Sequence, residues 1–347
     1  MMNWIFICPA DNRPVGGNKV IYRSVEYLCS LGYQSEVFHP KRANYRGRAF
    51  RALSFLFGPR NPFQVPNHGA RLEWFNHNAN ICNRSLSPDI DVLIIPEVMV
   101  PMLVPRAKKL SFRYVIFCQN GFLVDSGSDH FSKKDLSQLY EDAEAILSIS
   151  DDTTCLLQLS YPGIKSRVFR VFADKTRRPE KFLKENLITY MPRKLALHAG
   201  KVLFFLKSRL PTSWVIQPID GLSESEAHSL LARSKIFLSF SELEGFGLPP
   251  YEAALLGNLV VGYSGSGGDE FFRRPVFRKV ENGDLVSYVD EIITAISDWD
   301  NSESVESLVL SPSSWLIDEY SDAKVNKLWH EAVAFVNKSI SNGGTSL

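Results

Sequence analysis

Apolar runs of strand length alternate with helix-like patterns along almost the whole of this 347-residue chain. The run from Val92 to Ile95 has only apolar side chains, which is typical of a strand covered on both faces. The expected strands are residues 4–8, 34–39, 91–95, 113–118, 145–150, 187–191, 214–217, 236–240, 259–263 and 276–280. The expected helices include residues 18–31, 152–160, 224–233, 250–257, 285–298 and 321–341. This alternation predicts an α/β fold, with parallel sheets that carry helices on both faces.

The length of the chain predicts two domains, because a typical domain has about 150 residues. A polar and basic stretch, residues 174–186, is expected to link them, which gives domains at 1–175 and 184–320. Hydrophobic residues make up 45% of the chain and charged residues 22%, which allows large cores and argues against disorder. The net charge of +1 argues against a dedicated nucleic-acid-binding protein, so we expect no nucleic-acid partner.

The five cysteines form no C-x-x-C pair, and several lie in apolar runs. We expect them to be reduced core residues of a cytosolic protein, rather than a disulfide framework or a zinc site. No apolar run approaches the roughly 20 residues that span a bilayer. No basic segment precedes the first apolar stretch, as it would in a signal peptide. A cytoplasmic location is therefore expected.

The segment from Ile236 to Gly257 predicts a strand, a glycine-rich loop and a short helix in succession. Pro249 and Pro250 suit the first positions of that helix, where a missing N–H costs nothing. Gly257 suits its C-terminal cap. Such a unit turns free backbone N–H groups and a positive helix end toward the carboxyl edge of a sheet. An anion such as a nucleotide pyrophosphate can bind there.

Two glutamates, Glu244 and Glu252, lie eight positions apart in this unit. We expect Glu244 to end the strand side of the loop, so that its carboxylate reaches into the crevice. Glu252 is expected in the first helical turn, where a carboxylate can accept hydrogen bonds from ribose hydroxyls. A second interpretation is also open, because a glutamate in a first helical turn is favoured by the helix dipole alone. Clusters of glycine and proline are also ordinary turn signals.

Residues 241–257, with the strand before them and residues 260–271 after them, resemble the donor-binding signature of retaining glycosyltransferases of family 4. That signature is a Glu-x7-Glu motif with a Glu-Gly-Phe-Gly-Leu-Pro core, which is matched residue for residue from Glu244 to Pro249. The resemblance is clear over residues 224–271. It implies the GT-B fold, in which two Rossmann-like, doubly wound parallel-sheet domains face each other across a cleft. It also implies that the final helix, 321–341, crosses back to the N-terminal domain.

The resemblance also implies roles for the residues of the signature. Glu244 would contact the hydroxyls of the donor sugar near the reacting carbon, and Glu252 would hold the ribose. Backbone N–H groups around the loop would hold the sugar and the diphosphate. The loop residues that this implies as donor-binding are Gly245, Phe246, Gly247 and Leu248.

Cations are needed opposite the departing diphosphate, because negative charge develops there. The related enzymes carry an arginine and a lysine, a few residues apart, after the first strand of the C-terminal domain. Here Arg193 and Lys194 are adjacent, so the family spacing is not kept. The sequence favours Arg193, which can bind phosphate through two N–H groups, over Lys194, since neighbouring side chains rarely point the same way. A solvated helix start is the alternative interpretation.

The N-terminal half carries two further candidates. Gly16 and Gly17 follow the first strand, where the related enzymes have a Gly-Gly loop that faces the donor, although a tight turn explains the pair nearly as well. Gln119 and Asn120 follow the strand at 113–118, at an edge where many relatives carry a histidine. Their amides can bond sugar hydroxyls on the acceptor side but cannot act as a general base.

No metal site and no cofactor are expected. Asp89-Ile90-Asp91 has the D-x-D form that some transferases use for a divalent cation, but its position predicts a turn into a buried strand. The chain has no H-E-x-x-H motif and no cluster of cysteine and histidine.

A basic segment, residues 41–60, has six lysines and arginines interleaved with aromatic residues and no acidic residue. One interpretation is a surface element that touches an anionic membrane or an anionic lipid-linked acceptor. The other is a helix packed on the N-terminal sheet, with its arginines extended to solvent.

The resemblance implies a transferase that moves a sugar from a nucleotide-diphosphate sugar to a glycan or lipid-linked acceptor. It implies retention of the anomeric configuration, without a metal, in polysaccharide or glycoconjugate synthesis. The expected location is the cytoplasm, including the inner face of the membrane. Two alternatives stay open: a nucleotide-sugar epimerase of the GT-B fold, and a catalytically silent GT-B module that binds a glycan or a partner protein.

Overall fold

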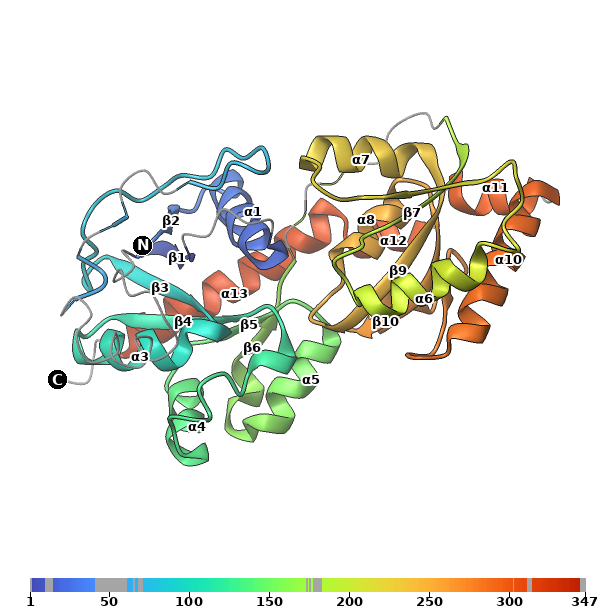
Figure 1. Cartoon of the computed structure of the whole chain (residues 1–347). Coiled ribbons are helices and arrows are strands. Elements are labelled where there is room, and N and C mark those ends of the chain that lie inside the picture. The colour runs from blue at the N-terminus through green and yellow to red at the C-terminus, as the bar shows by residue number, and fades with distance from the viewer. Residues whose placement is uncertain are drawn as a thin grey trace. The chain divides into compact units, whose positions relative to one another are not determined.

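The computed structural model describes residues 2–9, 15–40, 61–64, 66–67, 71–172, 174, 176, 183–301, 303–310 and 314–343. The basic segment 41–60 lies outside them. The chain divides into two compact units, each built around one parallel sheet, which confirms the predicted α/β fold (Figure 1). Unit 1 consists of Met1–Ile149, Thr153–Asp174 and Val325–Leu347, and unit 2 of Ser150–Asp152 and Lys175–Lys324.

Unit 1 contains a six-stranded sheet in the order β2-β1-β3-β4-β5-β6, in which all neighbours are parallel. The strand order changes direction between β1 and β3, so this pair marks the topological switch point of the sheet. The strands are β1 (Asn3–Ile7), β2 (Ser35–Phe38), β3 (Asp91–Pro96), β4 (Arg113–Cys118), β5 (Ile146–Ser148) and β6 (Val168–Arg170). The first five match expected strands. β6 was missed, because its three residues are only half-buried and carry no apolar run.

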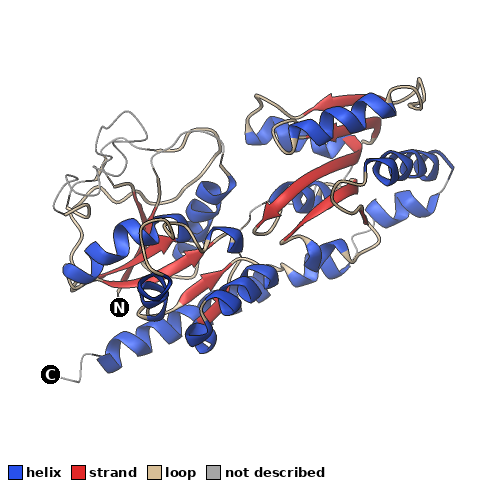
Figure 2. Cartoon of the chain, turned by 60° about the horizontal axis from the view of Figure 1, so that its bottom comes forward, coloured by secondary structure: helices blue, strands red, loops and turns tan. Residues whose placement is uncertain are grey.

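Helices flank the strands in both units (Figure 2). The helices associated with unit 1 are α1 (Gly16–Ser30), η1 (Glu97–Met99), α3 (Val100–Lys109), η2 (Gly121–Leu123), α4 (Lys133–Glu141), α5 (Asp151–Ser160), η3 (Pro162–Arg167) and α13 (Asp322–Gly343). The last helix packs on unit 1 through Trp329, which is fully buried, lies edge-on to Phe6 and donates its indole N–H to the carbonyl of Phe172 at 2.9 Å.

Unit 2 contains a five-stranded parallel sheet in the order β11-β10-β9-β7-β8. Here the strand order changes direction between β7 and β9. The strands are β7 (Glu185–Tyr190), β8 (Val215–Pro218), β9 (Ser234–Glu244), β10 (Leu259–Ser266) and β11 (Phe277–Lys279). The helices are α6 (Ala196–Leu206), α7 (Glu224–Arg233), α8 (Leu248–Leu255), α9 (Asp269–Phe272), α10 (Leu285–Asn301), α11 (Glu303–Leu310) and α12 (Ser314–Glu319).

Strand β9 runs four residues beyond its expected end, because β10 continues beside it. Ser241 pairs with Ser264, and after a register shift Glu244 pairs with Ser266. Glu244 is therefore the last residue of the strand, at the carboxyl edge of the sheet.

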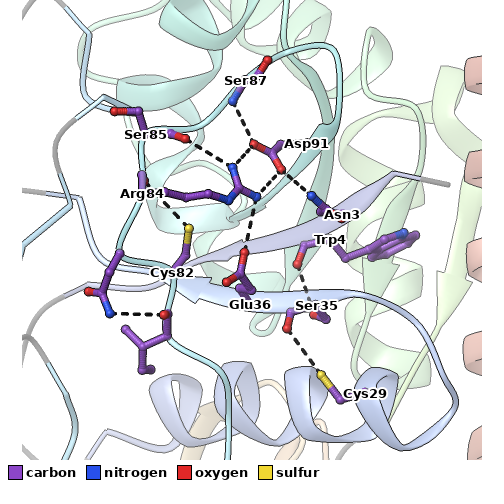
Figure 3. Close-up of polar contacts among 12 residues, drawn as sticks. Asn3, Trp4, Cys29, Ser35, Glu36, Cys82, Arg84, Ser85, Ser87 and Asp91 are labelled. Atoms are coloured by element: carbon purple, nitrogen blue, oxygen red, sulfur yellow. Dashed lines mark hydrogen bonds and ion pairs between the residues drawn. The ribbon is translucent and has the colours of Figure 1, made fainter.

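The D-x-D segment forms a turn followed by a buried strand, as predicted (Figure 3). Arg84 donates two hydrogen bonds of 2.7 Å to the buried Asp91 carboxylate, which also accepts the N–H of Ser87 and the side-chain amide of Asn3. Burial alone would raise the pKa of Asp91, but these bonds together hold it below its usual value. The Asp91 carboxylate is thus engaged in a structural network.

Removing that carboxylate should destabilise the protein. We expect Asp91→Ala to lower the free energy of unfolding by about 2 kcal/mol, less than for a fully buried pair because Arg84 is partly exposed. Asp89→Ala, two residues away and exposed, should change it by less than about 0.5 kcal/mol. Urea unfolding of both variants checks this. Equal effects would contradict the structural assignment.

Candidate functional site

The candidate site of unit 2 lies at the switch point of its sheet. Two loops leave the carboxyl edge there, one after β7 and one after β9. In open α/β sheets, ligands bind in the crevice that such diverging loops create. Lys194 lies on the first loop and Glu244 is the last strand residue before the second, and the lysine ammonium bonds the glutamate carboxylate.

Arg193 points elsewhere. Its guanidinium is 3.9 Å from the carboxylate of Asp220, and both side chains are more than half exposed. The sequence favoured Arg193 over Lys194, whereas the structure places Lys194 against Glu244. The two neighbours do diverge, as expected for adjacent side chains.

Two non-glycine residues with left-handed backbone flank this ion pair. Leu195 has φ +39° and Leu243 has φ +49°. This conformation costs of order 1 kcal/mol or more for a leucine and is commonest at functional sites. Leu195 directly follows Lys194 and Leu243 directly precedes Glu244.

The glycine-rich loop after Glu244 leads directly into α8. Gly247 has φ +87° and caps the helix, so α8 begins at Leu248, two residues earlier than expected. In the described part of the chain, the N–H groups of Gly247 and Leu248 donate to no other group. Pro249 and Pro250 have no N–H, so these two donors represent the free end of the helix. Gly257, with φ +78°, follows the end of the helix as predicted.

A second glycine-containing loop, after β10, packs against the loop that follows Glu244. A Cβ atom on Gly267 would lie 2.3 Å from the carbonyl oxygen of Gly245 and 2.4 Å from that of Glu244. The N–H of Gly267 donates to the Glu244 carbonyl at 3.1 Å. The two loops thus touch backbone to backbone, which requires glycine at this position.

Glu252 lies in the second turn of α8, not in the first as expected, because the helix begins earlier. Its side chain is largely buried, and its carboxylate is 3.6 Å from Nε2 of His228 on α7. His228 was not singled out from the sequence. The sequence predicted the helix that carries His228 correctly. A helix prediction does not show, however, that His228 would contact Glu252.

The candidate residues of unit 1 gather at the carboxyl edge of the other sheet. Gly16 and Gly17 form the start of α1, the helix that follows β1. A Cβ atom on Gly17 would lie 2.6 Å from Oε1 of Gln119, which follows β4. The structure therefore brings together two features that the sequence suggested separately. The buried Nε2 of Gln119 has no hydrogen-bond partner among the described residues.

Glu97 is a buried carboxylate that the sequence analysis missed. It follows β3 directly and accepts the N–H of Gln119 at 3.0 Å. Burial raises the pKa of Glu97 to about 7, against the lowering effect of the N–H groups that it accepts. The sequence signal that could have identified Glu97 is its position immediately after a predicted buried strand. Asn120, next to Gln119, accepts the N–H of Phe122 through its side-chain oxygen and so caps η2.

All five cysteines are free thiols, and Cys155 is exposed on α5, contrary to the expectation that they are core residues. Among the described residues, no three histidine, cysteine, aspartate or glutamate side chains gather as a metal site. No helix in the described ranges has the length and apolarity required to span a membrane.

Comparison with known proteins identifies the fold. No protein-family model matches the chain. A putative glycosyltransferase 41 from Sulfolobus islandicus filamentous virus is 58% identical over 40 residues, which are 12% of this chain and 12% of the viral protein. HepE from Anabaena, solved with UDP-glucose, has a TM-score of 0.62 at 13% identity, over 96% of this chain and 100% of its own. The lipopolysaccharide outer core galactosyltransferase WaaB, in its apo form, has a TM-score of 0.58 at 16% identity, over 96% and 99%. These similarities show the GT-B fold, as predicted.

Proposed function

We propose that this chain is a glycosyltransferase that transfers a sugar from a UDP-sugar. The observation that carries the proposal is the contact of Lys194 with Glu244 at the switch point of the unit 2 sheet, beside the Glu-Gly-Phe-Gly-Leu-Pro loop. Proteins of the same fold support it, since HepE was solved with UDP and with UDP-glucose. The short match to a viral protein named as a glycosyltransferase agrees with it.

The proposal gives the loop residues separate tasks. Glu244 contacts hydroxyls of the donor sugar near the reacting carbon. Lys194 compensates the charge that develops on the departing diphosphate, together with the N–H groups of Gly247 and Leu248. This division requires neither a metal ion nor a resident cofactor. We further propose that the anomeric configuration is retained.

Glu252 is proposed to bind the ribose hydroxyls of the nucleotide. A carboxylate with two oxygens can accept both vicinal hydroxyls, and His228 at 3.6 Å would hold it in place. Arg193 keeps a secondary role, because it is exposed and lies nearer to Asp220 than to the glutamates of the loop.

The acceptor is proposed to be a glycan or a lipid-linked sugar that unit 1 binds. Gly16 and Gly17 begin α1, Gly17 lies against the side chain of Gln119, and the unpartnered amide donor of Gln119 offers a bond to a hydroxyl. We assign residues 1–175 with helix 321–341 to the acceptor domain and residues 184–320 to the donor domain. The enzyme would act in polysaccharide or glycoconjugate synthesis in the cytoplasm, with residues 41–60 as a contact to the membrane.

Thermal unfolding in the presence of UDP, GDP, ADP, CMP and dTDP tests the proposal. A ligand at 100 times its dissociation constant adds about 2.7 kcal/mol of stability, so UDP should raise the melting temperature. Glu252→Ala should abolish that rise. Glu185→Ala is the matched control, since Glu185 begins β7 at the opposite edge of the same sheet. Stabilisation by none of the nucleotides, or an equal rise in both variants, would contradict the assignment.

A further inference from the structure

Helix α6 is apolar on both sides, yet only one side is covered. Ala199, Val202 and Leu206 are buried against the rest of unit 2. On the other side, Leu197 and Phe204 are 72% and 71% exposed. A helix that is apolar all round is normally buried on all sides, but no described residue covers the outer side of α6.

The exposed side chains form one continuous stripe. Leu197, Lys201, Phe204 and Phe205 recur at the helical spacing that places residues on one face. The rings of Phe204 and Phe205 pack edge-to-face, with centroids 5.4 Å apart. Helix α6 itself lies on the outside of unit 2 (Figure 1).

All the charged residues that lie near the stripe in the sequence are basic. Residues 191–219 contain five lysines and arginines and no aspartate or glutamate. Lys194 and Arg209 bond Glu244 and Asp290, and Arg193 lies near Asp220. Lys201 and Lys207 make no ion pair within the described part of the chain. Two unneutralised ammonium groups therefore border the exposed phenylalanines.

We propose that this outer face of α6, which we call the α6 stripe, docks on an anionic lipid membrane. Phenylalanine and leucine beside lysine, without acids, is the pattern of helices that lie in the membrane interface. The lysine within the stripe favours lipid over a protein partner, because lysine is depleted from the cores of protein interfaces. In a membrane its long side chain can reach the headgroups while its neighbours enter the acyl region.

Docking through α6 has a direct consequence for the loop before it. Lys194 lies only two residues before the first residue of α6, and Leu197 is the second residue of the helix. The α6 stripe would thus hold the loop that carries Lys194 close to the lipid surface. In the sequence, the α6 stripe is separate from the basic segment 41–60.

Vesicle flotation with the full chain tests this inference without any nucleotide or sugar. We expect the protein to float with vesicles of phosphatidylcholine and phosphatidylglycerol, and about ten-fold less with phosphatidylcholine alone. The double variants Phe204→Ser/Phe205→Ser and Lys201→Glu/Lys207→Glu should each weaken binding about ten-fold or more. Their melting temperatures should equal that of the wild type, because all four side chains are exposed.

The matched controls are Leu159→Ser, which changes an equally exposed leucine on α5, and Lys327→Glu, which changes an exposed lysine on α13. Both should float like the wild type. No flotation with the anionic vesicles, or flotation that survives both double variants, would overturn the proposal. So would a wild-type dimer that the phenylalanine variant dissociates, because the stripe would then be a protein interface. Failure of nucleotide binding leaves these outcomes unaffected.

Discussion

Lys194→Met is expected to lower kcat for transfer from a UDP-sugar by about 10²–10³-fold. The ammonium group bonds Glu244 at the switch point, and Glu244 makes no other ion pair among the described residues. Its removal should therefore leave the charge of the departing diphosphate to backbone N–H groups alone. Arg193→Met is the matched control in the neighbouring position. It should lower kcat by no more than about five-fold, because its guanidinium lies near Asp220 and makes no ion pair with Glu244.

Both variants are measured by steady-state kinetics. The donor in these assays is a sugar derivative of the nucleotide that stabilises the protein. A larger loss in Arg193→Met than in Lys194→Met would show that the cation at the diphosphate is Arg193, as the sequence favoured. Urea unfolding separates catalysis from folding. Both side chains are about half exposed or more, so the free energy of unfolding should change by less than about 0.5 kcal/mol in either variant.

The choice between these two cations shows where the sequence ceased to be informative. Spacing predicts that adjacent side chains diverge, but not which of them turns toward β9. The loop next to Lys194 also contains Leu195, which adopts a left-handed backbone with φ +39°. Leucine rarely takes this conformation, so residue preferences could not predict it.

Strand positions were predicted well for a simple reason. Strands covered on both faces, such as β3 and β4, are continuous apolar runs, and these were found within one residue of their observed ends. Strand β6, at the sheet edge, has only half-buried residues and gave no such signal. The extension of β9 to Glu244 depends on pairing with β10, a long-range contact that local pattern does not contain.

The contacts of Gly17 show that local sequence does not predict which distant residue will pack against a glycine. Gly17 was noted as a residue that lets a ligand approach, and the structure shows what else it lets approach, namely the side chain of Gln119. Partners that come from distant strands are fixed by the sheet order, which places β1, β3 and β4 side by side. Glu97 was not identified from the sequence, because its contact with Gln119 depends on that strand order.

Glu97→Gln is expected to stabilise the protein at and above neutral pH, by about 3 kcal/mol. Burial raises the pKa of this carboxyl from 4.5 to about 7 in the folded protein. Between these values the folded state keeps a proton that the unfolded state has lost, so the free energy of unfolding falls as the pH rises through this window. Above it, the folded protein carries a buried carboxylate. Glutamine stays neutral and still offers an oxygen to the N–H of Gln119.

Urea unfolding at pH values below, within and above this window provides the measurement. The wild type should lose about 3 kcal/mol across it, whereas Glu97→Gln should lack that loss. Glu331→Gln, on an exposed position of α13, should keep the wild-type pH dependence. Stability that rises with pH in the wild type alone would show that the bonds from Gln119 outweigh burial and that the pKa is lowered.

The same variant separates stability from function. Glu97 holds the backbone of Gln119, whose side chain meets Gly17 at the edge of the unit 1 sheet. If Glu97→Gln is more stable at neutral pH yet transfers sugar more slowly, the carboxylate is maintained against a cost in stability, as is common at active sites. If it is more stable and equally active over the whole pH range, the acid serves only to shape the loop. Comparing the two pH profiles distinguishes these outcomes, because a catalytic contribution follows the ionisation near pH 7 and a purely structural one does not.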